Sequence, residues 1–173
     1  MDKENMNQFI AEYGKDIFSF CRQMVFDQRD AEDLYQDTFV VALSKDDVDF
    51  RDNPKNYLLT IAVNLWQNRK RKYACRQRIA PTVSMDDTCL LRKAVDDISV
   101  EDKVIAGIQK TKVREAVDRL PDKLRLVTVL FYMEDRDIDF ISEALAISKG
   151  TVKSRLFHAR KKLEQELEEL LYE

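Results

Sequence analysis

The sequence predicts an all-α protein: two small helical domains joined by a linker, the C-terminal one a helix-turn-helix. Glycine and proline number only three each in 173 residues, whereas average usage predicts about twelve and nine. Apolar residues recur at three- and four-residue steps along most of the chain, as they do on one face of a helix. This pattern is lost between residues 79 and 107. We therefore expect domains at 1–78 and 108–173 and a linker at 79–107.

The predicted N-terminal domain begins with two amphipathic helices. Apolar residues from Phe9 to Phe26 keep helical spacing, and Gly14 predicts local fraying. Asp30 is the expected N-cap of a second helix over residues 31–45. The residues of this helix expected to point inward are Leu34, Phe39 and Leu43.

Asn53-Pro54 favours the start of a third helix, which runs from Tyr57 to Arg78. Its first half is apolar and contains Trp66. Its second half, residues 69–78, holds six Lys or Arg and no acidic residue. Basic charge beside Trp66 and Tyr73 suits nucleic acid whose bases stack on rings, but Trp66 could equally be core and the basic run a solvated helix end.

The C-terminal domain is expected to open with a helix from Ile108 to Leu120 and, after Pro121, a second helix over residues 122–133. An apolar stripe on the second helix consists of Leu124, Val127, Leu130 and Phe131. A third helix precedes a short break at Ala146-Ile147. Small Ser142, before the break, should allow the two helices to approach closely. Ser148 is the expected N-cap of the next helix, and Val152 is expected to be buried against the first.

The helix after this break is strongly basic, with six Lys or Arg and no acid over residues 149–163. A helix-turn-helix places the start of its second helix in the DNA major groove. The residues at that end are Lys149, Thr151, Lys153, Ser154 and Arg155. The chain as a whole has a net charge of -3, which hides the positive charge of this helix and of residues 69–78. An ordinary helical hairpin with a solvated basic face is the alternative.

Other function classes find little support in the sequence. Three separated cysteines predict neither a disulfide framework nor a zinc site, and one histidine cannot build a metal cluster. Three scattered glycines form no phosphate loop, so we expect no cofactor, no metal and no catalytic residue. The N-terminus lacks the pattern of a signal peptide and no apolar run would span a bilayer, which predicts a cytoplasmic protein without membrane insertion.

Three motifs in order resemble the extracytoplasmic-function (ECF) sigma factors of bacterial RNA polymerase. The first is DAEDLYQDTF at Asp30–Phe39, similar to the family's polymerase-docking helix. The second is YLLTIAVN at Tyr57–Asn64, similar to the helix that engages the -10 element. The third is Leu120-Pro121 followed by ISKGTVKSR at Ile147–Arg155, similar to the -35 reader. The resemblance covers nearly the whole chain.

The resemblance implies a promoter-specificity subunit, not an enzyme, with sigma region 2 at 1–78 and region 4 at 108–173. The residues it places against polymerase are Asp30, Glu32, Asp33, Gln36 and Asp37. Those it places at the -10 element are Asn64, Arg69, Lys70, Arg71 and Arg76. Those it places at the -35 element are Lys149, Thr151, Lys153, Ser154, Arg155, His158 and Arg160.

The implied partners are core RNA polymerase, promoter DNA and, as in many members of the family, an anti-sigma factor; we expect a monomer when free. Three features depart from the family pattern. Tyr57 replaces a tryptophan, Phe140 and Ser142 replace a glutamate and an alanine, and Ala146 replaces a glycine, which makes a left-handed turn residue costlier.

Two other functions fit parts of the pattern. A stand-alone helix-turn-helix regulator would bind duplex DNA unaided, usually as a dimer on paired half-sites, but would not need the second basic stretch. A helical adaptor that binds only protein would leave both basic stretches unexplained.

Overall fold

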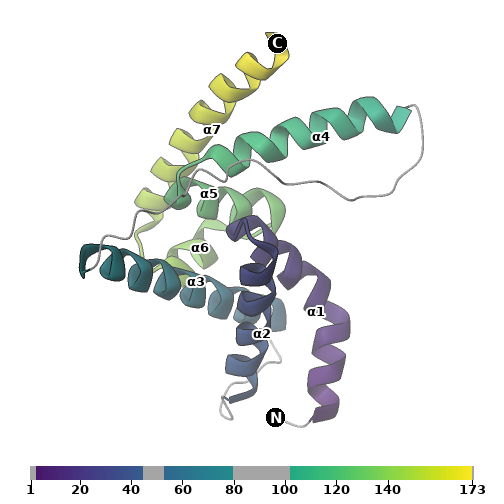
Figure 1. The fold of residues 1–173 in the computed structure, drawn as a ribbon, viewed down its shortest axis with the longest axis vertical. Coiled ribbons are helices and arrows are strands. Elements are labelled where there is room, and N and C mark those ends of the chain that lie inside the picture. Colours follow the sequence, from purple (N-terminus) through teal and green to yellow (C-terminus); the bar gives the residue numbers. More distant parts are fainter. Residues whose placement is uncertain (1–2, 45–52, 80–101, 173) are drawn as a thin grey trace. The chain divides into compact units, whose positions relative to one another are not determined.

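The computed structural model describes residues 3–44, 53–79 and 102–172, all in helices and short connections (Figure 1). The chain divides into two compact units, Met1–Leu91 and Arg92–Glu173, hereafter unit 1 and unit 2. The division falls inside the predicted linker, whose boundaries stay a prediction. The part of the linker in which the sequence allows a short helical piece, residues 89–95, lies outside the described residues.

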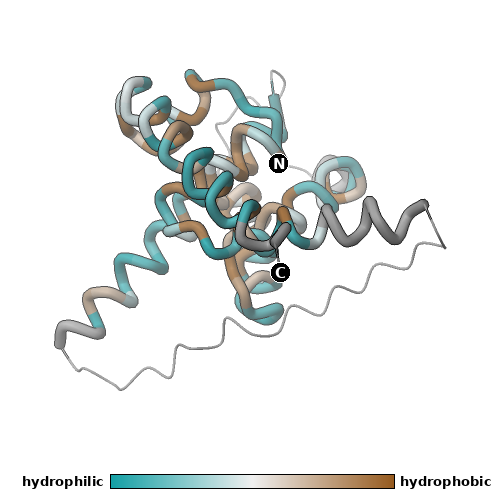
Figure 2. Tube along the Cα trace, turned by 90° about the horizontal axis from the view of Figure 1, so that it is seen from above, coloured by the Kyte–Doolittle hydropathy of each residue, from teal (hydrophilic) through white to brown (hydrophobic). Residues whose placement is uncertain are grey.

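Unit 1 consists of α1 (Lys3–Met24), α2 (Gln28–Ser44) and α3 (Pro54–Ile79), each packed against the other two. Figure 2 shows hydrophobic and hydrophilic residues alternating along the helices, as amphipathic packing requires. Its core includes Ile17, Phe20, Met24, Leu34, Phe39, Leu59 and Trp66. Of the three residues of α2 predicted to face inward, Leu34 and Phe39 are buried, but Leu43 is exposed.

Gly14 lies within α1, which continues through it without the predicted fraying. A Cβ atom at Gly14 would lie 2.9 Å from the Tyr35 hydroxyl oxygen. The Tyr35 ring packs edge-on against Phe18 and Phe39, with centroids 5.5 and 4.9 Å away. The absence of a side chain at Gly14 therefore lets α1 and α2 approach closely, with the Tyr35 ring packed between them. Burial raises the pKa of Tyr35.

The start of α2 differs from the prediction. The Asp27 carboxylate accepts the backbone N–H groups of Arg29 (2.8 Å) and Asp30 (3.1 Å), so the helix begins at Gln28 and Asp27 caps it. The predicted cap, Asp30, is in the first turn, where its charge still suits the helix dipole. The start signal at Asn53-Pro54 is confirmed: Pro54 is the first residue of α3, three residues before Tyr57, and Asn53 Oδ1 accepts the N–H of Asn56 at 3.2 Å.

Unit 2 contains α4 (Asp102–Arg119), α5 (Asp122–Thr128), a π-helix η1 (Val129–Met133), α6 (Ile138–Leu145) and α7 (Lys149–Tyr172). The helix predicted from Ile108 begins earlier, at Asp102. The helix predicted over 122–133 widens into η1, which buries both Val129 and Leu130. Helix α7 packs against α4, α5 and α6, so it is the central element of this unit.

Arg125 is a charged residue in the core of unit 2 that periodicity did not predict. Arg125 is 1% exposed. Its guanidinium donates to Asp122 Oδ1 at 2.8 Å and to the Asp118 carbonyl at 3.4 Å. The buried stem thereby packs like an apolar residue while the charged end joins α4 to α5.

Arg125→Ala is expected to lower the free energy of unfolding of unit 2 by about 3 kcal/mol, because it leaves a cavity and removes this link. Arg125→Met fills the cavity and should cost much less. The rate of hydrogen exchange at the buried Leu130 amide would report the opening of unit 2. Fluorescence of Trp66, the sole tryptophan, would follow unit 1 as the internal control. Unchanged exchange in the alanine variant would contradict the role given to Arg125.

Ala146 adopts a left-handed backbone conformation, with φ 51° and ψ 47°. Because that conformation costs a residue with a Cβ about 1–2 kcal/mol, Ala146→Gly should stabilise unit 2 by on the order of 1 kcal/mol. The same exchange measurement would show slower opening. Faster opening in the glycine variant would show that the alanine turn is unstrained.

Candidate nucleic-acid and protein interfaces

Helices α6 and α7 are joined by a tight turn whose backbone groups are satisfied locally. The Asp137 carboxylate caps α6 by accepting the N–H of Phe140 at 2.7 Å. At the other end, the N–H of Ala146 donates to the Glu143 carbonyl and that of Ile147 to the Ser142 carbonyl, both at 3.1 Å. The loss of the usual glycine therefore leaves the left-handed turn in place, at the cost of strain at Ala146.

Two serines fix the direction in which α7 leaves this turn. Ser142 Oγ donates to the Ile147 carbonyl at 2.6 Å, so the small residue expected to allow close approach also ties α6 to the turn. Ser148 Oγ accepts the N–H of Thr151 at 3.1 Å, which confirms the predicted N-cap. Val152 is fully buried, as predicted. The start of α7 is thus held by hydrogen bonds on one side and by core packing on the other.

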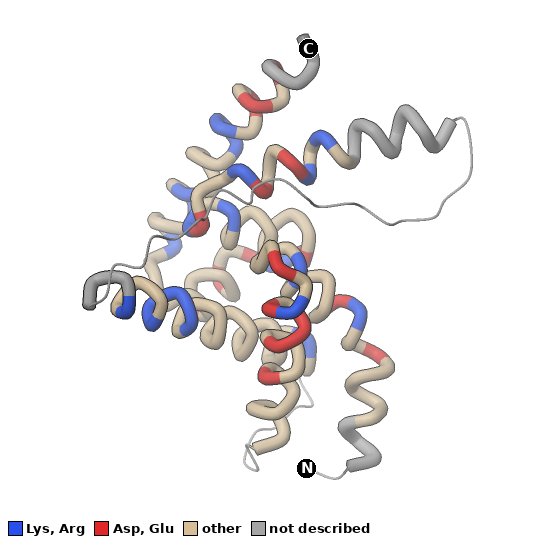
Figure 3. The backbone as a smooth tube through the Cα atoms, in the orientation of Figure 1, with Lys and Arg blue, Asp and Glu red and all other residues tan. Residues whose placement is uncertain are grey.

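The predicted DNA-reading residues differ in exposure along α7. Thr151 and Arg155 are half-buried. The exposed members of the set are Lys149, Lys153, Ser154, His158 and Arg160. Lys149 Nζ lies 2.8 Å from Asp139 Oδ2 of α6, and this hydrogen bond raises the pKa of Lys149. Figure 3 shows the blue Lys and Arg positions following one another along α7.

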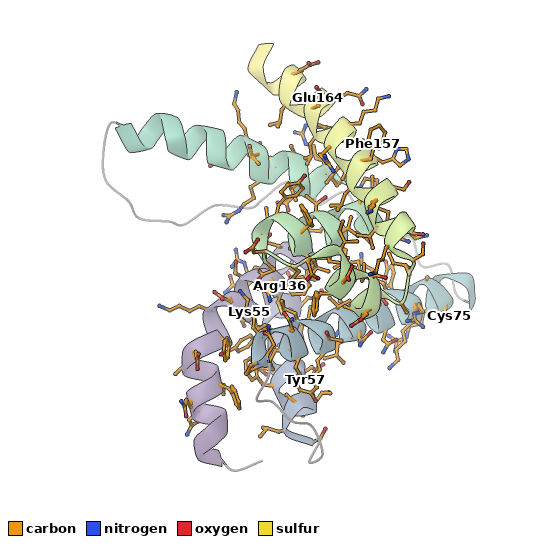
Figure 4. All side chains as sticks on the ribbon, turned by 180° about the vertical axis from the view of Figure 1, so that it is seen from behind. Lys55, Tyr57, Cys75, Arg136, Phe157 and Glu164 are labelled. Carbon is orange, nitrogen blue, oxygen red and sulfur yellow. The ribbon has the colours of Figure 1, made fainter. Side chains whose placement is uncertain are left out.

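Sequence reasoning missed Phe157, which is 61% exposed on α7 and labelled in Figure 4. It lies one helical turn from Lys153, Ser154 and Arg160, so an apolar ring stands among the cations. The Phe157 and His158 rings meet edge-on, with centroids 5.6 Å apart. The sequence did contain a signal for it. Leu156 keeps the helical spacing of the core positions, so its neighbour Phe157 must point away from the core.

On α2, the acidic residues of the predicted protein-binding set lie opposite the packed side. Asp30, Asp33, Gln36 and Asp37 are exposed, whereas Glu32 is half-buried and accepts a hydrogen bond from Gln28 Nε2 at 2.9 Å. Among them lies Val40, 61% exposed and also missed from the sequence. An apolar centre with a polar rim is the usual anatomy of a protein–protein interface.

Helix α3 separates into a packed half and a basic half. Trp66 is only 6% exposed, and its Nε1–H donates to the Met24 carbonyl at 3.1 Å. It is therefore a core residue, and the alternative of a stacking platform for bases is wrong for this ring. Tyr73, in the basic half, is 51% exposed and keeps that alternative open. Burial raises the pKa of Tyr57, near the start of the helix.

The residues predicted for the -10 element differ in exposure and contacts. Asn64, Lys70, Arg71 and Arg76 are exposed, and the Lys70 ammonium lies 5.8 Å from the Trp66 ring centroid. Arg69 instead contacts α2: one guanidinium nitrogen is 2.7 Å from Asp37 Oδ2 and another donates to the Asp30 carbonyl at 3.2 Å. A predicted DNA contact and a predicted protein contact are thus joined in one ion pair.

Within the described residues, no three His, Cys, Asp or Glu side chains gather closely enough to hold a metal ion. In the same part of the chain, no helix combines the length and apolar character needed to cross a bilayer. The groups gathered on α2, α3 and α7 are charges and hydrogen-bonding groups, which suit binding to protein and to phosphate.

Comparison with known proteins identifies the two units. Residues 9–75 match the family model described as Sigma-70 region 2, and residues 110–163 match Sigma-70, region 4. The chain is 29% identical over 174 residues to the ECF RNA polymerase sigma factor SigW of Bacillus subtilis, covering 98% of this chain and 92% of that one. It is 27% identical over 179 residues to the RNA polymerase sigma-H factor of Pseudomonas aeruginosa, covering 99% and 91%.

Solved structures show the same fold. The sigma factor RpoE, crystallised with the anti-sigma factor NepR from Bartonella quintana, matches with a TM-score of 0.74 at 21% identity, over 95% of this chain and 98% of that one. CnrH, in complex with the cytosolic domain of CnrY, matches with a TM-score of 0.65 at 21% identity, over 96% and 90%. With both sigma-70 regions present in order, this chain belongs to the ECF sigma factors of bacterial RNA polymerase.

Proposed function

We propose that this protein binds core RNA polymerase and directs transcription initiation at promoters with a -10 and a -35 element. The observation that carries the proposal is the pairing of two compact units with the two sigma-70 regions, each with its own basic surface. Residues 1–78 would act as region 2, residues 108–173 as region 4 and residues 79–107 as the linker. Two weak readers joined in one chain gain affinity because the second binds at a raised effective concentration.

In region 4, the exposed start of α7 would enter the major groove at the -35 element. Lys149, Thr151, Lys153, Ser154, Arg155, His158 and Arg160 are the proposed contacts. The ordered turn supports this assignment because it fixes the direction of the helix, and a reader must hold its side chains in one register. Phe157 joins the proposed set, since an exposed apolar ring can contact a thymine methyl group in that groove.

In region 2, α3 would lie near the -10 element, with Asn64 and, in its basic half, Lys70, Arg71 and Arg76 as the proposed contacts. The exposed face of α2 would dock on polymerase through Asp30, Asp33, Gln36 and Asp37, with Glu32 at its edge. Opposite signs on neighbouring helices let the two partners bind side by side without competing for one surface.

The protein would carry no chemistry of its own and would act in the cytoplasm, where polymerase and chromosome lie. An anti-sigma factor is a further proposed partner, because both structural neighbours were solved in complex with another protein and RpoE with an anti-sigma factor. A stand-alone regulator is the second candidate, favoured by the helix-turn-helix alone. The basic half of α3 counts against it.

Run-off transcription on a pool of promoter fragments with varied elements would test the proposal. Core polymerase plus this protein should initiate from a selected subset, and neither component should do so alone. Duplex binding by the protein alone without any initiation would favour the stand-alone regulator.

Arg155→Ala is expected to weaken holoenzyme binding to the selected promoter by about 1–3 kcal/mol if the guanidinium contacts a base. The matched control is Lys123→Ala, an exposed charge on α5 of the same unit. Binding would be measured by fluorescence anisotropy at one fixed salt concentration. A loss no larger than that of the control would remove Arg155 from the reading set.

Asp33→Arg should weaken binding to core polymerase while leaving the fold intact, because it reverses a charge on the exposed face of α2. Glu12→Arg, an equal reversal at an exposed position of α1, is the control. Affinity for labelled core and the thermal unfolding curve would be compared. Equal affinity for both variants would show that polymerase docks elsewhere.

A further inference from the structure

Arg69 differs from the rest of the basic half of α3 in both exposure and contacts. The positions after it, 70–76, are all exposed, whereas the Arg69 side chain is 35% exposed. Its guanidinium reaches the Asp30 carbonyl in the first turn of α2 and the Asp37 carboxylate two turns later. One side chain of α3 thus spans the edge of the surface proposed to bind polymerase.

This contact is poorly suited to be a source of stability. The Asp37 side chain is 56% exposed and Arg69 is 35% exposed, and ion pairs at such positions contribute little to folding because water screens them. The helices α2 and α3 are held together by buried side chains such as Leu34, Phe39 and Trp66 instead. Loss of the ion pair should therefore leave unit 1 folded.

The contact lies within the acidic surface of α2. Asp30, Asp33 and Asp37 lie at three- and four-residue steps, so their carboxylates repel one another on one side of α2. The guanidinium, bonded at two points of α2, places a positive charge among these carboxylates and gives the Asp37 side chain a partner in a defined position. A carboxylate that is ordered before binding loses less conformational entropy when a partner docks.

We propose that Arg69 is a positioning residue of the polymerase-binding face of α2 and not a contact to promoter DNA. This inference rests on the proposed function, because it names a residue that prepares the same docking surface. It reassigns one of the five residues placed at the -10 element from the sequence. The exposed Asn64, Lys70, Arg71 and Arg76 remain the proposed DNA contacts of that helix.

The test compares full-length Arg69→Ala, Arg69→Lys and Lys72→Ala, the last removing the same charge from an exposed position of α3. Arg69→Ala should weaken binding to core polymerase on the order of fivefold. Arg69→Lys should recover part of this loss, because an ammonium can reach Asp37 but cannot span two points. Lys72→Ala should bind core as the wild type does, and all three should unfold at the wild-type temperature.

A second readout separates positioning from DNA contact. The slope of log affinity for promoter DNA against log salt, measured with preformed holoenzyme, should be unchanged by Arg69→Ala. A slope smaller by about 1 would mean a lost phosphate contact and overturn the proposal. Unaltered core binding by Arg69→Ala would also overturn the proposal. Tighter core binding would overturn it as well, because Arg69 would then compete with polymerase for Asp37.

Asp33→Arg in the same assay distinguishes this failure from failure of the proposed function. If wild type fails to bind core, or if Asp33→Arg binds as well as wild type, the docking surface itself is wrong and Arg69 has nothing to position. If wild type binds and Asp33→Arg does not, an unaltered Arg69→Ala variant refutes the role of Arg69 alone.

Discussion

Burial of Val152, Leu156 and Ala159 along one edge of α7 ties the basic helix to the rest of unit 2. These residues follow one another at four- and three-residue steps, so the positions between them turn outward. The outward positions carry Lys153, Ser154, Phe157 and His158. The same periodicity therefore builds the core and selects which side chains can meet DNA. The turn at Ala146 and the cap at Ser148 then set the angle at which that face is presented.

In unit 1, the same relation between buried and outward positions shapes two proposed binding surfaces, one on α2 and one on α3. Helix α2 buries its apolar side and leaves carboxylates and Val40 outside. Helix α3 contributes to the core only as far as Trp66, and beyond the Arg69 contact its residues 70–76 are exposed and rich in Lys and Arg (Figure 3). A charged extension of this kind adds little to stability, since it buries almost nothing, but it carries positive potential well beyond the packed helices.

The helices could be predicted because their apolar residues keep a regular period, and the motifs could be recognised because they are short and local. The misses have physical causes. Asp27 and Asp30 are equally good capping residues, so the local sequence does not choose between them. In the folded unit α2 begins at Gln28, and Asp27 is therefore the cap. Arg125 is buried although charged, because its end reaches a carboxylate and a carbonyl while its stem fills the core. The Arg69–Asp37 pair joins positions 32 residues apart, a separation at which no periodicity operates.

The central claim is that two small units read two promoter elements in one complex. The most direct measurement is the affinity of the holoenzyme for a promoter chosen by transcription, compared with templates in which either element is scrambled. Bivalent reading predicts that scrambling either element weakens binding by at least about tenfold, and that scrambling both weakens it further. Equal affinity for the intact promoter and for one with a scrambled -35 element would contradict the role given to α7.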